Sequence, residues 1–363
     1  MTEYEKTILR LWLTGIKGVG IKTQKRLLSF FGDEAGIYNA SYQELAKVVP
    51  SEKAEKIAGN KSLAGAKKLY ERYAERNIKI IYPGHEYYPE KLLHIYDYPE
   101  ILFVKGNPEC MKATGIAVVG SRNPTIYGSE TAAYFAACFS GKDICTISGL
   151  ARGIDSAAHK GAIDGGGKTV AVLGCGINVT YPRENAELYD RIEKNGAILS
   201  EYGFDVEPLQ GQFPMRNRII SGISDGVLVV EARKRSGSLI TADYALEQGK
   251  QVYALPGRIF DLCSEGTNNL IKQGAMCVTD PSDIFFDIYG KEEENNTFEN
   301  KEINLTEEEK NIYSHIGLEP VFIDDIIAKS GCKTSKTISI LYGLLDKEFI
   351  KQPVDGYYIR KIC

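Results

Sequence analysis

The sequence predicts an α/β protein with a doubly wound, mostly parallel, Rossmann-like sheet, flanked by a small all-α N-terminal domain and a C-terminal winged-helix domain. Short runs rich in β-branched residues recur between residues 76 and 288, and amphipathic stretches of 8–16 residues separate most of them. Near-continuous apolar strands that alternate with helices are typical of a parallel sheet that is covered on both faces.

The 363 residues divide into four predicted parts. Residues 1–75 show apolar residues at helical spacing and form a helical domain of the helix–hairpin–helix or SAM-like kind. Residues 76–288 form the extended Rossmann-like domain. Residues 289–304 are acidic and polar, which predicts a solvated linker because such a composition cannot bury a core. Residues 305–363 follow the element order of a winged helix.

The individual elements follow from short apolar runs and from helical periodicity. The predicted strands of the central domain are Ile116–Gly120, Ile144–Ile147, Val170–Leu173, Ala197–Leu199, Val227–Val230, Val252–Leu255 and Met276–Val278. The predicted C-terminal helices are Leu305–Ile316, Ile323–Ala328 and Lys336–Lys347, followed by a hairpin over Phe349–Tyr358.

Composition excludes several protein classes. The chain is 43% hydrophobic and 25% charged, which rules out extensive disorder, and it has no run of 18 apolar residues that could span a membrane. Residues 1–10 show no apolar leader, and eight cysteines without a C-x-x-C pair indicate reduced core residues. The reduced cysteines lead us to expect a cytoplasmic protein, and the four scattered histidines lead us to expect no metal site.

Charge is unevenly distributed. The net charge of −4 argues against a chain that binds polyanions over its whole surface, but residues 1–81 carry 15 basic against 9 acidic residues. Residues 305–363 carry 8 basic against 9 acidic residues, which provides little attraction for phosphates. We therefore expect residues 305–363 to form a module that contacts another protein or has a regulatory role, rather than one that anchors DNA.

Four loops combine glycine or proline with cationic side chains. Three of them follow predicted strands, over residues 120–124, 148–155 and 231–238, and the fourth, residues 213–218, precedes the strand Val227–Val230. Ligands of open α/β sheets bind beyond the carboxyl ends of the strands, where helix N-termini attract anions. The sequence therefore predicts a polyanion or nucleotide site at this edge.

Two other glycine motifs are interpreted as structural. The run Ala162–Thr169 matches a permissive phosphate-binding loop pattern, but its Gly-Lys-Thr part follows a helix and leads into a strand, so Gly165–Gly167 is predicted to be a helix C-cap and tight turn. The run Gly174–Gly176 lacks the third glycine of a dinucleotide fingerprint, because Val179 stands there. No cofactor is expected.

Catalytic constellations are sparse, and no catalytic residue is assigned. Asp155 and His159 lie four residues apart on one helix, which indicates a local pair that holds the helix start. Residues 13–30 have helix–hairpin–helix form, in which Gly18, Gly20 and Lys22 could bind a nucleic-acid phosphate. The alternative is a helical packing module, in which Gln24 occupies the usual position of a small residue.

A series of long motifs, in order through the central domain, resembles the DNA-processing protein A family (DprA, also called Smf). These motifs are D-Y-P-E-I-L-F-V-K-G (97–106), G-S-R (120–122), S-G-L-A-R-G-I-D-S-A-A-H (148–159), L-G-C-G-I-N-V-T-Y-P-R-E-N (173–185), L-S-E-Y (199–202), F-P-M-R-N-R-I-I-S-G (213–222), S-G-S-L-I-T-A (236–242), A-L-P-G (254–257) and E-G-T-N-N-L-I-K-Q-G-A (265–275).

This resemblance implies a homodimeric cytoplasmic protein that binds single-stranded DNA, protects incoming strands and helps to load RecA recombinase in natural transformation. The DNA-binding residues that it implies are Ser121, Arg122, Gly149, Arg152, Gly153, Arg183, Phe213, Arg216 and Arg218. Secondary candidates are Arg233, Ser236, Gly237 and Ser238. Gln210 stands where the family often has a lysine, and Phe213 offers a ring for base stacking.

An enzyme is the alternative on the same fold. Lysine-decarboxylase-like phosphoribohydrolases carry a P-G-G-x-G-T-x-x-E loop with a catalytic glutamate. Here the corresponding segment is Ser236–Thr241, and the nearest acid is Asp243. The sequence therefore favours a DNA-binding protein over a nucleotide-processing enzyme, and it predicts no catalytic activity.

Overall fold

The computed structural model describes residues 1–290 and 305–361, and the predicted linker falls almost entirely outside these residues. The N-terminal region is helical, as predicted. Its helices are α1 (Glu3–Gly15), α2 (Ile21–Phe31), α3 (Glu34–Asn39), α4 (Tyr42–Ala46), α5 (Ser51–Gly59) and α6 (Ala64–Ala74).

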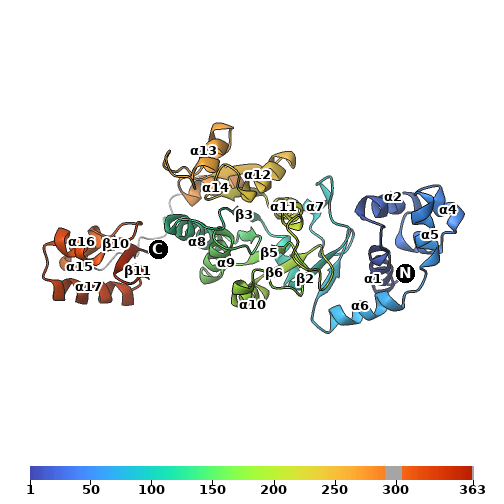
Figure 1. Ribbon diagram of the computed structural model, residues 1–363, viewed down its shortest axis with the longest axis horizontal. Coiled ribbons are helices and arrows are strands. Elements are labelled where there is room, and N and C mark those ends of the chain that lie inside the picture. Colours follow the sequence, from blue (N-terminus) through green and yellow to red (C-terminus); the bar gives the residue numbers. More distant parts are fainter. Residues whose placement is uncertain (291–304, 362–363) are drawn as a thin grey trace.

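A nine-stranded sheet follows, with the strand order β1-β2-β6-β5-β4-β3-β7-β8-β9 (Figure 1). The strands β6, β5, β4, β3, β7, β8 and β9 run parallel to one another. At one edge, β2 is antiparallel to β6, and β1 is antiparallel to β2. The strands are β1 (Lys79–Ile81), β2 (Leu102–Gly106), β3 (Gly115–Val119), β4 (Cys145–Ser148), β5 (Thr169–Leu173), β6 (Ala197–Ser200), β7 (Gly226–Val229), β8 (Gln251–Ala254) and β9 (Met276–Cys277).

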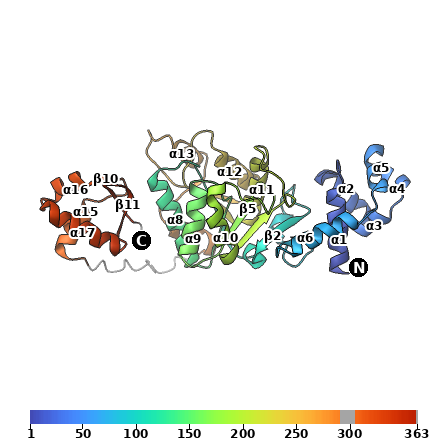
Figure 2. The same cartoon turned by 60° about the horizontal axis from the view of Figure 1, so that its bottom comes forward.

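The helices between these strands, and the helix after the last one, cover both faces of the sheet (Figure 2). They are α7 (Glu90–Leu93), α8 (Ile126–Ser140), α9 (Ile154–Asp164), α10 (Ala186–Asn195), α11 (Gln212–Ile223), α12 (Gly237–Glu247), α13 (Glu265–Lys272) and α14 (Pro281–Tyr289), with short 3-10 turns over Pro108–Met111 and Arg183–Asn185. Side-chain alternation along β3 shows the two layers: Ile116 and Val118 pack with α8 and α9, whereas Ala117 and Val119 pack with α11 and α12.

The seven predicted strands are confirmed with ends that shift by a few residues at most. Strands β1 and β2 were not predicted as strands, since β1 has only three residues and both run antiparallel at one edge of the sheet. The glycine run is a helix end, as expected: α9 stops at Asp164, the Gly167 N–H donates to the Ala162 carbonyl over 2.8 Å, and β5 begins at Thr169.

Residues 305–361 form three helices and a small antiparallel sheet around their own apolar core. The elements are α15 (Glu307–Ser314), β10 (Val321–Phe322), α16 (Ile323–Ser330), α17 (Thr334–Asp346), β11 (Ile350–Val354) and β12 (Tyr357–Arg360). The predicted helices and hairpin are present, and β10 adds a third strand beside β12.

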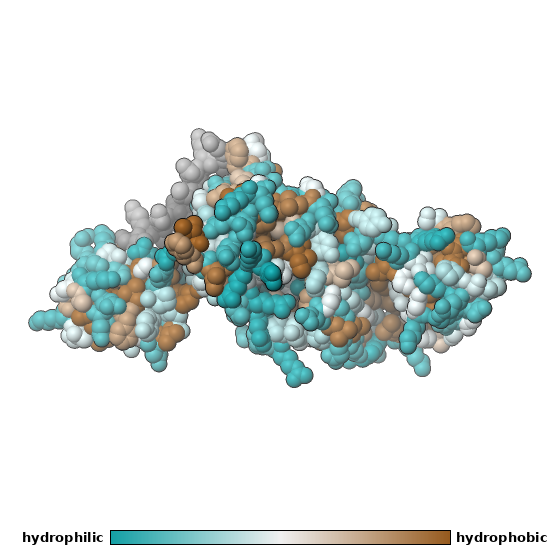
Figure 3. Space-filling view, turned by 45° about the horizontal axis from the view of Figure 1, so that its top comes forward, coloured by the Kyte–Doolittle hydropathy of each residue, from teal (hydrophilic) through white to brown (hydrophobic). Residues whose placement is uncertain are grey.

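Surface character and helix length complete the description. On the face drawn in Figure 3, hydrophilic residues cover most of the surface, and hydrophobic patches are largest over the central part. Within residues 1–290 and 305–361, no helix is both long enough and apolar enough to cross a membrane.

Candidate functional site

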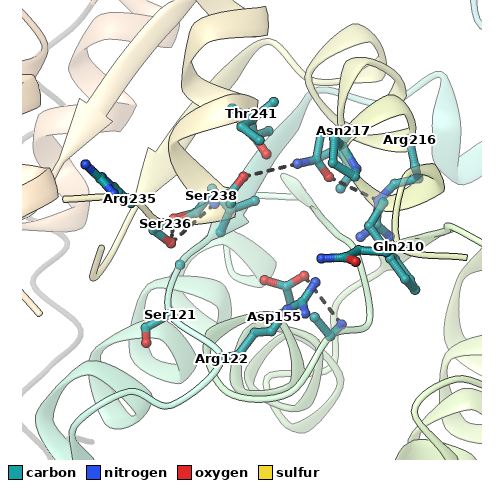
Figure 4. A pocket seen from close by; sticks show the side chains of 18 of the residues that line it. Ser121, Arg122, Asp155, Gln210, Arg216, Asn217, Arg235, Ser236, Ser238 and Thr241 are labelled. Carbon is teal, nitrogen blue, oxygen red and sulfur yellow. Dashed lines mark hydrogen bonds between the residues drawn. The ribbon is translucent and has the colours of Figure 1, made fainter. Parts of the chain in front are cut away.

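A crevice of about 700 Å³ opens beyond the carboxyl ends of β3 and β7. The segments after these strands form two of its sides, and the N-terminal part of α11 forms a third (Figure 4). The lining residues that bear on function are Ser121, Arg122, Asp155, Tyr181, Gln210, Phe213, Arg216, Asn217, Arg233, Arg235, Ser236, Gly237, Ser238 and Thr241. All three predicted strand-end loops and the segment 213–218 therefore meet in one place, with Asp155 as the contribution of the loop 148–155.

The segment after β3 is held closely against neighbouring backbone. The Ser121 N–H donates to the Glu231 carbonyl over 2.8 Å, and the Ser121 carbonyl accepts from the Ile154 N–H over 3.1 Å. Gly153 has a φ of +75°, and a Cβ there would lie 2.4 Å from the Ser121 oxygen. Only glycine fits this approach, and the tight packing leaves the Arg122 side chain exposed at the crevice.

Two aromatic rings and a guanidinium lie together at the crevice. The ring centroids of Tyr181 and Phe213 are 5.4 Å apart with an interplanar angle of 33°, and Arg122 Cζ lies 5.7 Å from the Phe213 centroid. A Cβ on Gly174 would lie 2.6 Å from Phe213 Cδ1, so glycine after β5 makes room for this ring. Tyr181 is exposed and Phe213 is half-buried, and accessible aromatic rings next to a cation can bind both a nucleobase and a phosphate.

The opposite side of the crevice is the start of α12. Ser236 is its N-cap: the Ser236 hydroxyl accepts from the Ser238 N–H over 3.4 Å and lies 2.7 Å from the Ser238 hydroxyl. Arg233 and Arg235 are exposed beside this helix start. Exposed arginines next to a helix N-terminus favour an anion.

The floor of the crevice is a buried cluster whose charged side chains form hydrogen bonds with nearby main-chain groups. Arg216 is 4% exposed, and its Nη1 donates to the Gly149 carbonyl over 2.8 Å and also to the Val172 carbonyl. Asp155 accepts from the Gly149 N–H over 3.1 Å. Burial raises the pKa of the Asp155 carboxyl, and the nearby Arg216 guanidinium opposes this rise. Arg216 therefore reaches the crevice as predicted, but its guanidinium is largely occupied by main-chain oxygens.

The structure gives Arg218 another environment than the one predicted. Its side chain is 1% exposed and lies outside the crevice lining of the described residues. Arg218 Nε donates to Asp97 over 2.9 Å, and its Nη2 donates to both Glu201 oxygens over 2.7 and 2.8 Å. The prediction that Arg218 faces DNA is therefore corrected, because two carboxylates already compensate its charge.

Four other predicted residues lie away from the crevice lining in the part of the chain that the structure describes: Gly149, Arg152, Gly153 and Arg183. Arg183 is exposed, and Arg152 forms an ion pair with Glu184 over 2.6 Å. Gly149 has a structural role, since a Cβ there would lie 2.4 Å from the Arg216 guanidinium.

Some lining residues were not predicted from the sequence. Tyr181, Asn217 and Thr241 belong to quoted motifs but were not singled out, although an aromatic residue next to proline in the 173–185 motif is a usable signal. The expected Asp155–His159 pair is also wrong. Asp155 binds main-chain N–H groups, whereas the fully buried His159 Nδ1 lies 2.7 Å from the Thr169 hydroxyl.

The hairpin between α1 and α2 forms a second hollow of about 700 Å³. Its lining includes Gly18, Gly20 and Lys22, as well as Lys17 and Lys53. Gln24 replaces a small residue without a void, since it is buried and its Nε2 donates to the Val19 carbonyl over 2.8 Å.

Comparison with known proteins gives close relatives. The chain is 49% identical to Protein Smf of Escherichia coli over 209 residues, which cover 57% of this chain and 56% of that protein. It is 46% identical to the DNA processing protein DprA of Streptococcus pneumoniae over 197 residues, which cover 54% of this chain and 70% of that protein.

Solved structures are also similar. The X-ray structure of DNA processing protein A from Streptococcus pneumoniae matches with a TM-score of 0.69 and 35% identity, over 78% of this chain and 97% of that one. A structure of DNA processing protein A from Helicobacter pylori, described for its single-stranded DNA binding mode, matches with a TM-score of 0.54 and 28% identity, over 58% of this chain and 95% of that one.

The family model described as DNA recombination-mediator protein A matches residues 79–288, which is more than half of the chain. The matched span contains β1 to β9 and every residue of the crevice. The resemblance inferred from the motifs is thereby confirmed. The chain belongs to the DNA recombination-mediator protein A family.

Proposed function

We propose that this protein binds single-stranded DNA in the crevice, with no sequence preference and without catalysing a reaction. The observation that carries the proposal is the meeting of exposed arginines with the paired rings of Phe213 and Tyr181. Arginines neutralise phosphates, and aromatic rings stack on any base, which is the combination used by proteins that bind single strands. The single-stranded DNA binding mode described for the Helicobacter pylori relative supports it.

The crevice divides these tasks among its residues. Arg122, Arg233 and Arg235 are exposed and contact phosphates, together with Ser121 and the Ser236–Ser238 turn. Phe213 stacks on a base, and Tyr181 extends the stacking surface. Gln210, an exposed neutral residue of the lining, adds hydrogen bonds rather than charge.

Titration of the full chain with oligo-dT, blunt duplex DNA and mononucleotides tests the proposal. We expect tight binding to oligo-dT. In a plot of log K against log[salt], we expect a negative slope whose magnitude is about 0.7 for each phosphate neutralised. Equal or tighter binding of the duplex under the same conditions would contradict it. Tight binding of a mononucleotide with chemical turnover would favour the enzyme alternative.

The wider role is also a proposal: a cytoplasmic homodimer that protects incoming strands and helps to load RecA in natural transformation. The family description as a recombination mediator supports it, as does the name of the Streptococcus pneumoniae relative. Light scattering tests the dimer. Loading is tested by measuring RecA-dependent ATP hydrolysis on DNA strands that a single-strand-binding protein already coats. If this chain helps to load RecA, its addition is expected to shorten the lag before hydrolysis begins.

The division of the chain into residues 1–75, 76–288, 289–304 and 305–363 belongs to the same proposal, with a winged helix at residues 305–363. Three helices followed by the β11–β12 hairpin, with their own apolar core, support this assignment. The hairpin hollow at Gly18, Gly20 and Lys22 is proposed as a secondary phosphate contact.

A further inference from the structure

The side chain of Arg218 projects from α11 on the side that faces away from the crevice. It lies two residues beyond Arg216, which is about 200° around the helix axis. Ile220, which also lines the crevice, lies at the same angle from Arg218 in the other direction along the helix, so Arg216 and Ile220 share the side opposite to Arg218. Any force that fixes Arg218 therefore fixes the rotation of the helix that presents Phe213.

Three acceptor oxygens on two segments hold this guanidinium. Glu201 follows directly after β6 and accepts two hydrogen bonds from Nη2, and Asp97 accepts one from Nε over 2.9 Å. The Glu201 side chain is 10% exposed, and that of Arg218 is 2% exposed. A buried guanidinium that uses two of its nitrogens to join two carboxylates restricts geometry more than an exposed ion pair does.

The neighbouring residue of Glu201 also contacts the start of α11. The Tyr202 hydroxyl donates to the Gln212 carbonyl over 3.4 Å, one residue before Phe213. The segment after β6 therefore touches α11 at its first turn and again at Arg218. Both contacts act on the part of the helix that carries Phe213.

The second anchor, Asp97, sits in a segment that is itself fixed. Three residues further on, Glu100 accepts from Arg10 of α1 over 2.8 Å, and both side chains are buried. Lys25 of α2 lies 3.4 Å from the centroid of the Tyr98 ring. The segment that carries Asp97 is therefore joined to α1 and α2, whereas Glu201 stands at the end of β6.

We propose that Arg218, held by Glu201 and Asp97, is a positioning residue that sets the rotation of α11 and thereby places Phe213 in the crevice. This inference rests on the proposed function for its effect on DNA, but its effect on the helix does not. Arg218 acts through Phe213 and makes no contact with the strand. It follows that removing the pair harms binding only while the Phe213 ring is present.

Glu201→Gln tests the proposal, since it keeps the shape of the side chain and removes its charge. Arg218→Lys is the second variant, because it keeps the charge but offers one nitrogen in place of the two, Nε and Nη2, that reach Asp97 and Glu201. Glu193→Gln is the matched control: it breaks the 3.3 Å pair between Lys105 and Glu193, which is also part-buried but does not involve α11.

Hydrogen exchange of the free chain is the first measurement. Amides of residues 216–219 donate to carbonyls in the first turn of α11, so they report whether that turn is held. We expect exchange there to be at least about fivefold faster in Glu201→Gln and Arg218→Lys, and unchanged in Glu193→Gln. Unchanged exchange in both test variants would overturn the proposal, whether or not the protein binds DNA.

A double-mutant cycle with oligo-dT is the second measurement. Glu201→Gln is expected to weaken binding by about five- to tenfold in the native background and by less than about twofold in Phe213→Ala. If Glu201→Gln weakened binding by the same factor in both backgrounds, Glu201 would act independently of Phe213. That result would contradict the positioning role. Absence of oligo-dT binding by the unmodified chain would instead contradict the proposed function, and the exchange experiment would then decide alone.

Discussion

The crevice at the sheet edge and the hollow at the α1–α2 hairpin have similar volumes, about 700 Å³ each, but differ in chemistry. Both are lined by glycine turns and cations. The crevice adds the two neighbouring, mutually tilted rings of Tyr181 and Phe213 and three exposed arginines, whereas the hollow offers lysines and main-chain N–H groups. Lysine is a flexible point charge without a planar face. The hollow is therefore suited to a phosphate alone, and the crevice to a strand with its bases.

The C-terminal elements extend this comparison. Lysines there are engaged with nearby carboxylates: Lys336 pairs with Glu308, and Lys347 pairs with Glu309 over 2.6 Å. Exposed pairs of this kind leave little net field for a phosphate backbone. The three regions should thus differ strongly in their contribution to DNA binding.

The largest effect is expected from Phe213→Ala. Loss of base stacking should weaken oligo-dT binding by about 1–3 kcal/mol, which is roughly 5- to 150-fold, with an almost unchanged salt slope. Fluorescence anisotropy at several salt concentrations measures both quantities. A markedly shallower slope would mean that the variant lost phosphate contacts instead, and the distinction between the two sites would weaken.

Arg122→Ala should have the next largest effect, on the order of 0.2–1 kcal/mol at physiological salt, because the guanidinium is exposed. Its signature is a salt slope shallower by about 0.7, the share of one phosphate. All oligonucleotide sequences should weaken alike. If Arg122→Ala and Phe213→Ala gave the same salt dependence, the division into phosphate and base contacts would be wrong.

Deletion of residues 305–363 should change single-strand affinity by less than about threefold, or roughly 0.7 kcal/mol. The reason is the balance of 8 basic and 9 acidic residues in this part of the chain. Binding of the truncated chain is compared with that of the full chain after light scattering has established an equal oligomeric state. A tenfold loss would show that the C-terminal elements do hold DNA.

The smallest effect is expected from Lys22→Ala at the hairpin. A single exposed lysine at the hollow should contribute less than about twofold to oligo-dT affinity, because a surface ion pair is worth little in water. The same anisotropy titration measures it, with Lys67→Ala of α6 as an exposed control. A loss as large as that of Arg122→Ala would place the hairpin on the path of the strand.

Local sequence patterns were sufficient for most of the secondary structure. Apolar runs such as Val170–Leu173 produced strands because a buried parallel strand needs little besides β-branched residues. The three-residue strand β1 escaped prediction because its pairing with β2, and not its own composition, makes it a strand.

The candidate site was predictable where function depends on loop position. The loops that carry Arg122 and Arg233 follow β3 and β7, which are neighbours in the sheet, so their meeting follows from topology alone. The need for glycine at Gly153 became visible only in the structure, since a positive φ next to the Ser121 oxygen excludes a side chain.

Only the tertiary structure decided which arginines of α11 are available to a ligand. Arg216 and Arg218 belong to one motif and look equivalent in sequence, yet main-chain oxygens hold the first, and Asp97 and Glu201 hold the second. Asp97 lies 121 residues from Arg218 along the chain. Burial and charge compensation depend on such distant partners, which no local pattern contains, whereas strand and turn formation depends on neighbours that the sequence displays.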